Sequence, residues 1–401
     1  MMPKTDGSLR IVLPGLVLTG VCYGLARFAY GLFLPGMRDT VGMTPTIAGV
    51  IGSGSYLGYC VAIVLSMLLV ERLGARRVAL MAGLVASLGM AMIAVSPSPW
   101  VLAFAVLFAG MSTGLASPPL ADAVARTIPP RGQARANTLI SSGTSVGIAF
   151  SGAIALVASD HWRSAYFLFT VLAVATTFWL ARAMPQAHGR DRPSAAPSKT
   201  SGHGLYRRDA LPLIYAATGM GFASTACWVF AGEVVVEVGG LAKESVSLVW
   251  VAMGVAGLLG GAAGDLIHRL GVTAVHRLFL VMLAAATLGL ALFPASLAMV
   301  LLSAALLGVA YMMLAGTYLV WGVNIYADRP AVGLGLPFLM IAVGQVIGAP
   351  VAGALMGSTS PLFTFAVFAC VALVTMVAAY RDEPERHYPR EQEASTTPKV
   401  G

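Results

Sequence analysis

Charged residues are scarce in this chain. Asp, Glu, Lys and Arg make up 10% of its 401 residues, whereas hydrophobic residues make up 58%. A soluble globular chain has about 25% charged residues, so the composition excludes that class and indicates an integral membrane protein. The apolar runs are long and lack a two-residue alternation, which favours membrane-spanning helices over a barrel. In this setting the formal charge of +8 does not predict a nucleic-acid partner.

Cysteine is scarce too, and its placement excludes the usual cysteine-based sites. The cysteines lie inside apolar runs with no CxxC spacing: Cys22, Cys60, Cys227 and Cys370. We interpret them as small buried side chains rather than disulfides or metal ligands. We expect no metal and no cofactor.

Groups that could perform catalysis are missing from the predicted spans. We expect every histidine in a loop or at a helix end: His161, His188, His203, His268, His276 and His387. No predicted span holds paired carboxylates or a Ser–His pair, and the chain has no G-x-x-x-x-G-K-[ST] run. The sequence therefore predicts neither an enzyme nor an ATP-driven pump.

The chain does contain apolar runs, each long enough to cross a membrane as a helix. We predict twelve spans: residues 11–34, 46–70, 77–95, 99–121, 137–158, 163–184, 211–232, 245–264, 273–293, 297–320, 332–356 and 361–380. They form an N-terminal six-helix bundle in 1–184 and a C-terminal one in 210–380. A polar linker, 185–209, joins the bundles, and a charged tail, 381–401, follows them.

Basic residues follow the predicted topology. If both termini are cytoplasmic, 21 of the 25 Lys and Arg residues lie in cytoplasmic segments, and only Arg38, Arg163 and Lys243 lie in outer ones. This is the positive-inside bias, and it supports an even number of spans. We expect a multi-pass protein of the inner membrane with both termini in the cytoplasm. The remaining basic residue, Arg27, lies inside the first span.

The two halves of the chain repeat weakly. Glycines of the fifth span recur in the eleventh, 201 residues later: Gly143, Gly147 and Gly152 against Gly344, Gly348 and Gly353. Thr19-Gly20 recurs as Thr218-Gly219, 199 residues later. Each match joins spans that are six apart, which is the pattern of two parallel repeats around one pathway.

At this level the chain resembles a transporter of the major facilitator superfamily. The loop after the second span keeps part of the family's G-x-x-x-D-R-x-G-R-R signature, with Glu71, Arg72 and Gly74 in register and a glutamate for the aspartate. The second half keeps a degenerate form in Asp265, Arg269 and Gly271. The resemblance implies two six-helix bundles that rock about a central solute site in alternating access.

A narrower resemblance is to the YbfB/YjiJ-type branch of that family. It rests on two stretches, Gly24-Leu25-Ala26-Arg27-Phe28-Ala29-Tyr30 in the first span and Tyr56-Leu57-Gly58-Tyr59 in the second. This branch implies no particular solute. The family's antiporter signature belongs in span five, but Gly344, Gly348 and Pro350 place a similar pattern in span eleven.

Arg27 is the strongest candidate for solute binding. A cation at hydrocarbon depth costs about 2.5–3.5 kcal/mol on insertion scales, and such residues usually face a bundle interior or a watery cavity. A guanidinium also suits two-point binding of a carboxylate. Tyr23, Arg27 and Tyr30 share one helix face and could form a cavity wall. The structural alternative is a charge satisfied by backbone carbonyls or a neighbouring acid.

Polar groups of the second half could complete the site. Tyr311 and Tyr318 are seven residues apart in the tenth span and therefore share a face, and Gln345 is the clearest uncharged polar group deep in the second half. Each could bind solute through a hydrogen bond. Each could equally form a contact between helices.

Coupling and gating residues are predicted at the helix ends. We hypothesise that Glu233, at the outer end of span seven, approaches Arg27 because their spans are equivalent in the repeat. Glu71 could meet the positive N-terminus of span eleven. Arg72 and Arg77 could pair with Asp122 or with the chain near Arg126, and Asp265 and Arg269 occupy the related positions of the second half. The alternative is that these loop charges only set the topology.

Taken together, the sequence predicts a secondary active transporter of a small organic solute, with an anionic or zwitterionic solute favoured. Its predicted partners are that solute, a coupling proton or ion, and the lipid bilayer, and we expect a monomer. One alternative is an efflux carrier for apolar or cationic compounds. A second is a membrane sensor that does not transport.

Overall fold

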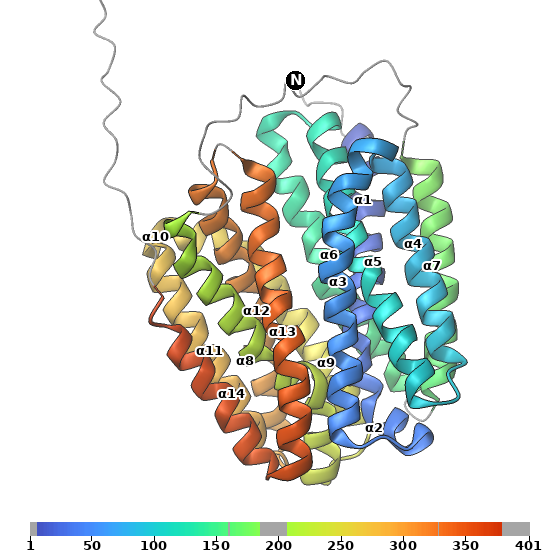
Figure 1. Cartoon of the computed structure of the whole chain (residues 1–401), viewed down its shortest axis with the longest axis vertical. Helices are drawn as coiled ribbons and strands as arrows, with labels where there is room; N and C mark the ends of the chain where they lie inside the picture. The colour runs from blue at the N-terminus through green and yellow to red at the C-terminus, as the bar shows by residue number, and fades with distance from the viewer. Residues whose placement is uncertain (1–5, 159–160, 185–206, 328, 379–401) are drawn as a thin grey trace, which may run out of the picture.

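The molecule is a bundle of long helices that run side by side (Figure 1). This computed structural model describes residues 6–158, 161–184, 207–327 and 329–378, and within them it contains helices and short connections but no strand. Eleven of the helices are long and apolar enough to cross a membrane. The predicted all-α membrane fold is therefore confirmed.

The first half of the chain supplies six of these spans. The first span joins three segments, α1 (Asp6–Thr19), the π-helix η1 (Gly20–Phe28) and α2 (Ala29–Val41). The others are α3 (Pro45–Leu73), α4 (Ala75–Ala94), α5 (Pro99–Thr127), α6 (Pro130–Ala158) and α7 (Trp162–Ala183).

The second half repeats this arrangement with more interruptions. Its first span joins η2 (Arg208–Ala210), α8 (Leu211–Glu233) and the π-helix η3 (Val234–Val238). The next joins α9 (Glu244–Gly257), the 3₁₀ turn η4 (Leu258–Ala262) and α10 (Ala263–Leu270). The remaining helices are α11 (Val272–Leu292), α12 (Leu297–Ile325), α13 (Pro330–Ser358) and α14 (Pro361–Thr375).

The predicted spans and the observed helices agree in order but differ in length. Most helices extend past the apolar core that predicted them, as α5 does in reaching Thr127 instead of residue 121. The twelfth is the exception, because α14 has 15 residues where about 20 are needed to cross a bilayer at right angles. The linker, apart from 207–209, and the tail lie outside the described residues, so the division into two bundles at that linker stays a prediction.

Glycines let the helices approach one another closely. A Cβ added at Gly24 would collide with the backbone of Gly147, and a Cβ added at Gly110 would collide with the backbone of Ser55. Contacts of this kind are how small residues hold helices together in lipid, where apolar side chains gain little by meeting one another. The abundance of glycine in the apolar runs therefore has a packing role.

Glycine contacts also reveal the internal repeat. Gly143 of α6 packs on Leu16 and Thr19 in the first span, and its counterpart Gly344 of α13 packs on Thr218 in α8. The third glycine of each set crosses to the other half, since Gly152 meets Ser247 of α9 and Gly353 meets Gly49 of α3. The fifth and eleventh spans therefore perform the same packing role in the two halves, as the repeat predicts.

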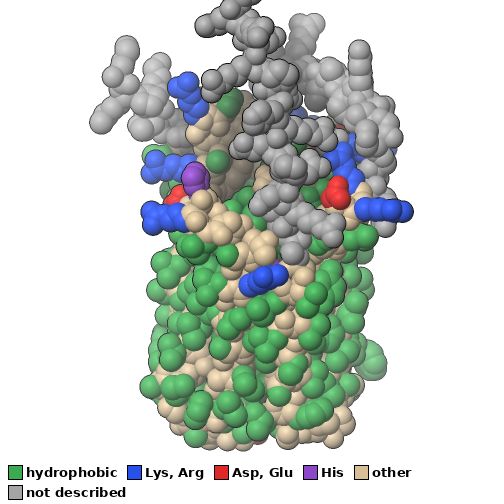
Figure 2. Space-filling view, turned by 90° about the vertical axis from the view of Figure 1, so that its left-hand side faces the viewer, with side chains coloured by type: hydrophobic (Ala, Val, Ile, Leu, Met, Phe, Trp, Pro, Cys, Tyr) green, Lys and Arg blue, Asp and Glu red, His purple; other side chains and the backbone are tan. Residues whose placement is uncertain are grey.

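Charge is distributed unevenly along the bundle. Figure 2 shows basic side chains gathered at one end of the molecule, above a broad belt of hydrophobic side chains. This basic end is where α3, α5, α7 and α10 finish and where α4, α6, α8 and α11 begin; its basic residues include Arg72, Arg76, Arg77, Arg126, Arg131, Arg135, Arg182, Arg207, Arg208, Arg269 and Arg277. The opposite end carries Arg38, Arg163 and Lys243.

Candidate functional site

Arg27 lies in the π-helical segment η1, between Gly20 and Phe28. A π-helix widens the turn and changes the direction of the side chains that follow, and such segments are frequent at functional sites. Gly24, one turn before Arg27, lets η1 press against α6 at Gly147. The Arg27 side chain reaches across to the second half, where it meets Gln345 of α13.

The Arg27 guanidinium is buried among aromatic rings. The side chain is 5% exposed. Its Cζ atom lies 4.8 Å from the ring centre of Tyr59, 4.9 Å from that of Tyr56 and 5.2 Å from that of Phe28. Rings at these distances attract a cation through their negative faces, by about 0.5–2 kcal/mol each. They stabilise the charge without neutralising it.

Arg27 has a neutral hydrogen-bond partner instead of a counter-ion. Its Nη2 atom donates to Oε1 of Gln345 over 2.7 Å, whereas its Nε atom is buried without an acceptor. Among the described residues, no carboxylate lies within ion-pair distance of Arg27. The centre of the protein therefore holds a net positive charge with donor capacity left over.

Gln345 connects Arg27 to a second span of the C-terminal half. Its Nε2 atom donates to the Tyr311 hydroxyl over 3.3 Å, so both ends of the amide are engaged. Gln345 lies on α13 and Tyr311 on α12, and both are buried. The structure thus brings together three of the predicted solute-site residues at the meeting point of the two halves.

Tyr23 belongs to the same region. Its hydroxyl lies 2.8 Å from the Ser117 hydroxyl on α5, and its ring packs edge-on against Tyr59 at 6.4 Å between centres. The Arg27 Cζ atom is 5.9 Å from the Tyr23 ring centre. Tyr23 therefore connects the surroundings of Arg27 to α5 in the N-terminal half.

Aromatic rings close the other side of Arg27. The Phe28 ring packs on Trp228 of α8 at 4.3 Å between centres, and Trp228 packs on Tyr311 at 5.1 Å. The indole Nε1 of Trp228 is buried without an acceptor. We call Tyr23, Arg27, Phe28, Tyr56, Tyr59, Trp228, Tyr311 and Gln345 the central cluster.

Four of these residues were not among the predicted site residues, namely Phe28, Tyr56, Tyr59 and Trp228. One signal could have found Trp228: it lies 200 residues after Phe28, which is within the spacing of the sequence repeat. Equivalent residues of the two halves meet at the axis between them, so a ring opposite Phe28 could have been expected. For Tyr56 and Tyr59, an apolar helix carries no sign of which ring faces a site.

Two of the predicted solute contacts are turned away from Arg27. The Tyr30 hydroxyl donates to the backbone oxygen of Ala48 over 2.9 Å. The Tyr318 hydroxyl lies 3.1 Å from Nδ1 of His276, which is fully buried inside α11. The expectation that every histidine lies in a loop or at a helix end is therefore wrong for His276, which lies within the predicted span 273–293 and is fully buried in the second turn of α11.

Glu233 pairs with a different arginine from the one predicted. It forms an ion pair with Arg38 of α2, and its side chain is 8% exposed. Arg38 lies three turns beyond Arg27 toward the opposite end, at the depth where α8 ends, so it is the cation within reach of Glu233. The hypothesis of an Arg27–Glu233 approach does not hold in this structure.

The predicted gating residues lie at the basic end but do not form the predicted pairs. Asp122 binds Arg126 one turn along its own helix, at 2.7 Å, rather than Arg72 or Arg77. A partner on the same helix is always within reach, which explains the preference. The other candidates are exposed, and within the described residues none of them forms an ion pair: Glu71, Arg72, Arg77, Asp265 and Arg269.

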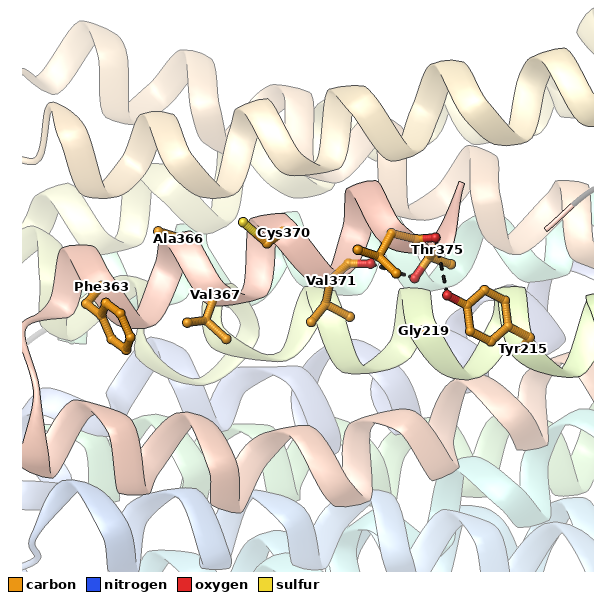
Figure 3. Close-up of a pocket in the computed structure, with 9 residues that line it drawn as sticks. Tyr215, Gly219, Phe363, Ala366, Val367, Cys370, Val371 and Thr375 are labelled. Atoms are coloured by element: carbon orange, nitrogen blue, oxygen red, sulfur yellow. Dashed lines mark hydrogen bonds between the residues drawn. The ribbon is translucent and has the colours of Figure 1, made fainter. Parts of the chain in front are cut away.

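A separate groove lies on the outside of the bundle between α8 and α14 (Figure 3). Its volume is about 440 Å³, and its lining is apolar except for Tyr215 and Thr375. The Tyr215 hydroxyl donates to the Val374 backbone oxygen over 3.2 Å, so its proton is already engaged. The groove has no charged lining residue, so the central cluster is the better candidate for binding a polar solute.

Comparison with known proteins agrees with this architecture. Residues 16–336 match the family model described as Major Facilitator Superfamily. The chain is 30% identical over 175 residues to a probable anion transporter 7 of Oryza sativa subsp. japonica, a match covering 42% of this chain and 39% of that protein. It is 25% identical over 269 residues to a hexuronate transporter of Bacillus subtilis (strain 168), covering 63% of this chain and 62% of that protein.

The comparisons cover different shares of the known proteins. The match spans about two fifths of the anion transporter's own length. Among solved structures, the chain resembles a POT family transporter in complex with 5-aminolevulinic acid, with a TM-score of 0.74 and 13% identity, over 93% of this chain and 95% of that one. At this identity the likeness shows the fold alone. The narrower YbfB/YjiJ-type branch stays a prediction.

Proposed function

Because the chain belongs to the Major Facilitator Superfamily, we propose that it carries a small anionic or zwitterionic organic solute across a membrane by alternating access. The solute binds in the central cluster, between the two halves. Two of the relatives are named for anionic solutes, which supports the sign of the charge.

The observation that carries this proposal is a buried cation that has no counter-ion among the residues the structure describes. Arg27 has one neutral hydrogen-bond partner and an Nε atom with no acceptor. A buried charge in that condition favours any ligand that supplies the opposite charge, because the ligand removes an unfavourable state of the free protein. A cationic solute would meet repulsion at the same point.

Contacts between the halves support a state closed at the opposite end. At the level of Arg27, the Ser53 hydroxyl donates to Val346 O over 2.9 Å. Nearer the opposite end, Arg38 pairs with Glu233, and Lys243 lies 3.7 Å from Asp39. Each contact joins one half to the other. We infer that the solute enters and leaves this state from the basic end.

The orientation follows from the charge. Since cytoplasmic segments are enriched in Lys and Arg, we propose that the basic end faces the cytoplasm and that both termini lie there, in an inner membrane. In the proposed cycle, the basic end opens to the cytoplasm while the Arg38–Glu233 pair keeps the other end closed. The two bundles, 1–184 and 210–380, are the units that move, and the proposed carrier works as a monomer.

A binding screen tests the proposal. The purified protein is heated with pools of anionic, zwitterionic, cationic and apolar solutes, and the unfolding temperature is compared with that of Arg27→Gln. We expect anionic or zwitterionic solutes to stabilise the wild type and to lose that effect in Arg27→Gln. Hits that are all cationic or apolar, and that persist in Arg27→Gln, would favour an efflux carrier for such compounds instead.

A further inference from the structure

Two buried hydrogen-bond donors in the central cluster have no acceptor. They are Nε of Arg27 and the indole Nε1 of Trp228. Both side chains are more than nine-tenths buried, with Arg27 5% exposed and Trp228 2% exposed. Native proteins rarely leave such donors unsatisfied, so each one calls for an explanation, such as a bound water, ion or ligand.

The two donors belong to one arrangement of side chains. Both side chains lie against the Phe28 ring, whose centre is 5.2 Å from Arg27 Cζ and 4.3 Å from the Trp228 ring centre. Tyr311 touches the Trp228 ring and accepts from Gln345, which in turn accepts from Arg27. Arg27 comes from η1 and Trp228 from α8, so a ligand held by both would bridge the two halves.

The chemistry of the donors indicates the kind of ligand. A guanidinium nitrogen binds a carboxylate well, because charge strengthens the hydrogen bond. The indole nitrogen is a neutral donor, and it suits a neutral oxygen of a hydroxyl or carbonyl group. A solute that satisfies both donors therefore carries a carboxylate and, at a second position, an oxygen acceptor.

We propose that Trp228 is a specificity residue of the solute site, donating from Nε1 to a hydroxyl or oxo oxygen of a carboxylate solute that is anchored on Arg27. The solute class is that of hydroxy and oxo acids, sugar acids included. This inference rests on the proposed function, since it needs an anion at Arg27. It adds that a simple alkyl carboxylate binds less tightly than its oxygenated counterpart.

Trp250 of α9 provides a matched control for Trp228. It is also a buried tryptophan, but its Nε1 donates to the backbone oxygen of Phe28 over 3.2 Å. Trp228→Phe removes a donor that has no acceptor in the free protein. Trp250→Phe removes a donor that is already hydrogen-bonded. Both changes remove the same buried volume, so Trp228→Phe should lower the unfolding temperature without ligand less than Trp250→Phe does.

Binding is measured with pairs of carboxylates that differ in their oxygens. The pairs are glucuronate with cyclohexanecarboxylate, gluconate with hexanoate, and lactate with propionate. In the wild type we expect the oxygenated member of at least one pair to bind about 3- to 10-fold more tightly, which is the effect of one neutral hydrogen bond. In Trp228→Phe this preference should disappear, because only the oxygenated member loses a hydrogen bond. Trp250→Phe should keep the preference.

The outcomes separate this inference from the proposed function. If both members of every pair bind equally to the wild type, or if Trp228→Phe keeps the preference, the role of Trp228 is refuted while the anion site stands. If no carboxylate binds to the wild type, the proposed function itself is refuted, and the role of Trp228 with it. If Trp228→Phe weakens both members equally, Trp228 has a packing role only.

Discussion

The ion pair between Arg38 and Glu233 is predicted to hold one end of the bundle closed, namely the end opposite the basic end. The perturbation is Glu233→Gln, which keeps the shape of the side chain and removes its charge. The Glu233 side chain is 8% exposed and that of Arg38 is 24% exposed, so the pair is largely shielded from water. Removing one partner of a fully buried pair costs about 3–5 kcal/mol.

Arg38 keeps some contact with water, so we reduce this cost to about 1–3 kcal/mol. A change of that size shifts an equilibrium between two conformations by about 5- to 150-fold. Because the pair joins α2 to α8, the free energy is lost only in the closed state. Glu233→Gln should therefore increase the population that is open at the opposite end.

The assay is a distance measurement between spin labels. Val95→Cys, after α4, and Ala295→Cys, before α12, place labels at exposed positions of the two halves at the opposite end. The four native cysteines are replaced first. Glu233→Gln should add a population at longer distance than in the unsubstituted background.

Asp39→Asn is the matched control for this measurement. It breaks the neighbouring contact between the same two halves, but Asp39 is 65% exposed and Lys243 is 44% exposed. Exposed pairs contribute about 0–1 kcal/mol, so Asp39→Asn should leave the distances nearly unchanged. The charge swap Arg38→Glu with Glu233→Arg should restore the closed population. Equal distributions for Glu233→Gln and its unsubstituted background would refute the lock.

Three further predictions concern the interior of the bundle. Gln345→Glu should give Arg27 a counter-ion. It should therefore raise the unfolding temperature of the free protein and remove the stabilisation by anionic solutes. An unchanged response to those solutes would contradict the proposed role of the Arg27 charge. Gly24→Ala should lower the unfolding temperature strongly, because the added Cβ would strike Gly147. Gly264→Ala is the control, since its Cβ would meet nothing within 4 Å, and it should leave the unfolding temperature nearly unchanged. Similar effects of the two changes would contradict the packing role of Gly24. Tyr318→Phe removes a hydroxyl that lies against His276. It should lower the free energy of unfolding by about 0.5–1.5 kcal/mol and leave the solute affinity unchanged. A loss of affinity would show that Tyr318 contacts the solute.

Sequence reasoning identified the fold because composition and hydropathy act over whole segments. It also identified Arg27, since a charge inside an apolar run is costly wherever the helix lies. Gln345 and Tyr311 were predicted as separate candidates, and the structure joins them to Arg27 through two hydrogen bonds. The sequence alone did not predict the packing that brings α12 and α13 against η1.

Pairs of charges were harder to predict than single charges. Glu233 could be recognised as the buried acid, but its partner depends on the depth at which α2 and α8 meet, and a sequence gives depth only within a few residues. Asp122 shows the opposite case, since its partner Arg126 is one turn away on the same helix. A preference for that local partner could have been predicted from the spacing alone.

Uptake into proteoliposomes with Arg27 variants is the decisive measurement. The labelled anionic solute that most stabilises the purified protein is followed into vesicles carrying the wild type, Arg27→Lys or Arg27→Gln, with protein content and unfolding temperature matched. A charge-assisted hydrogen bond contributes about 1.5–3 kcal/mol, so at solute concentrations well below saturation uptake should fall by about 10- to 150-fold in Arg27→Gln. Arg27→Lys keeps the charge and should retain part of the uptake. Uptake by Arg27→Gln at the wild-type rate would contradict the assignment of this buried cation to the solute site.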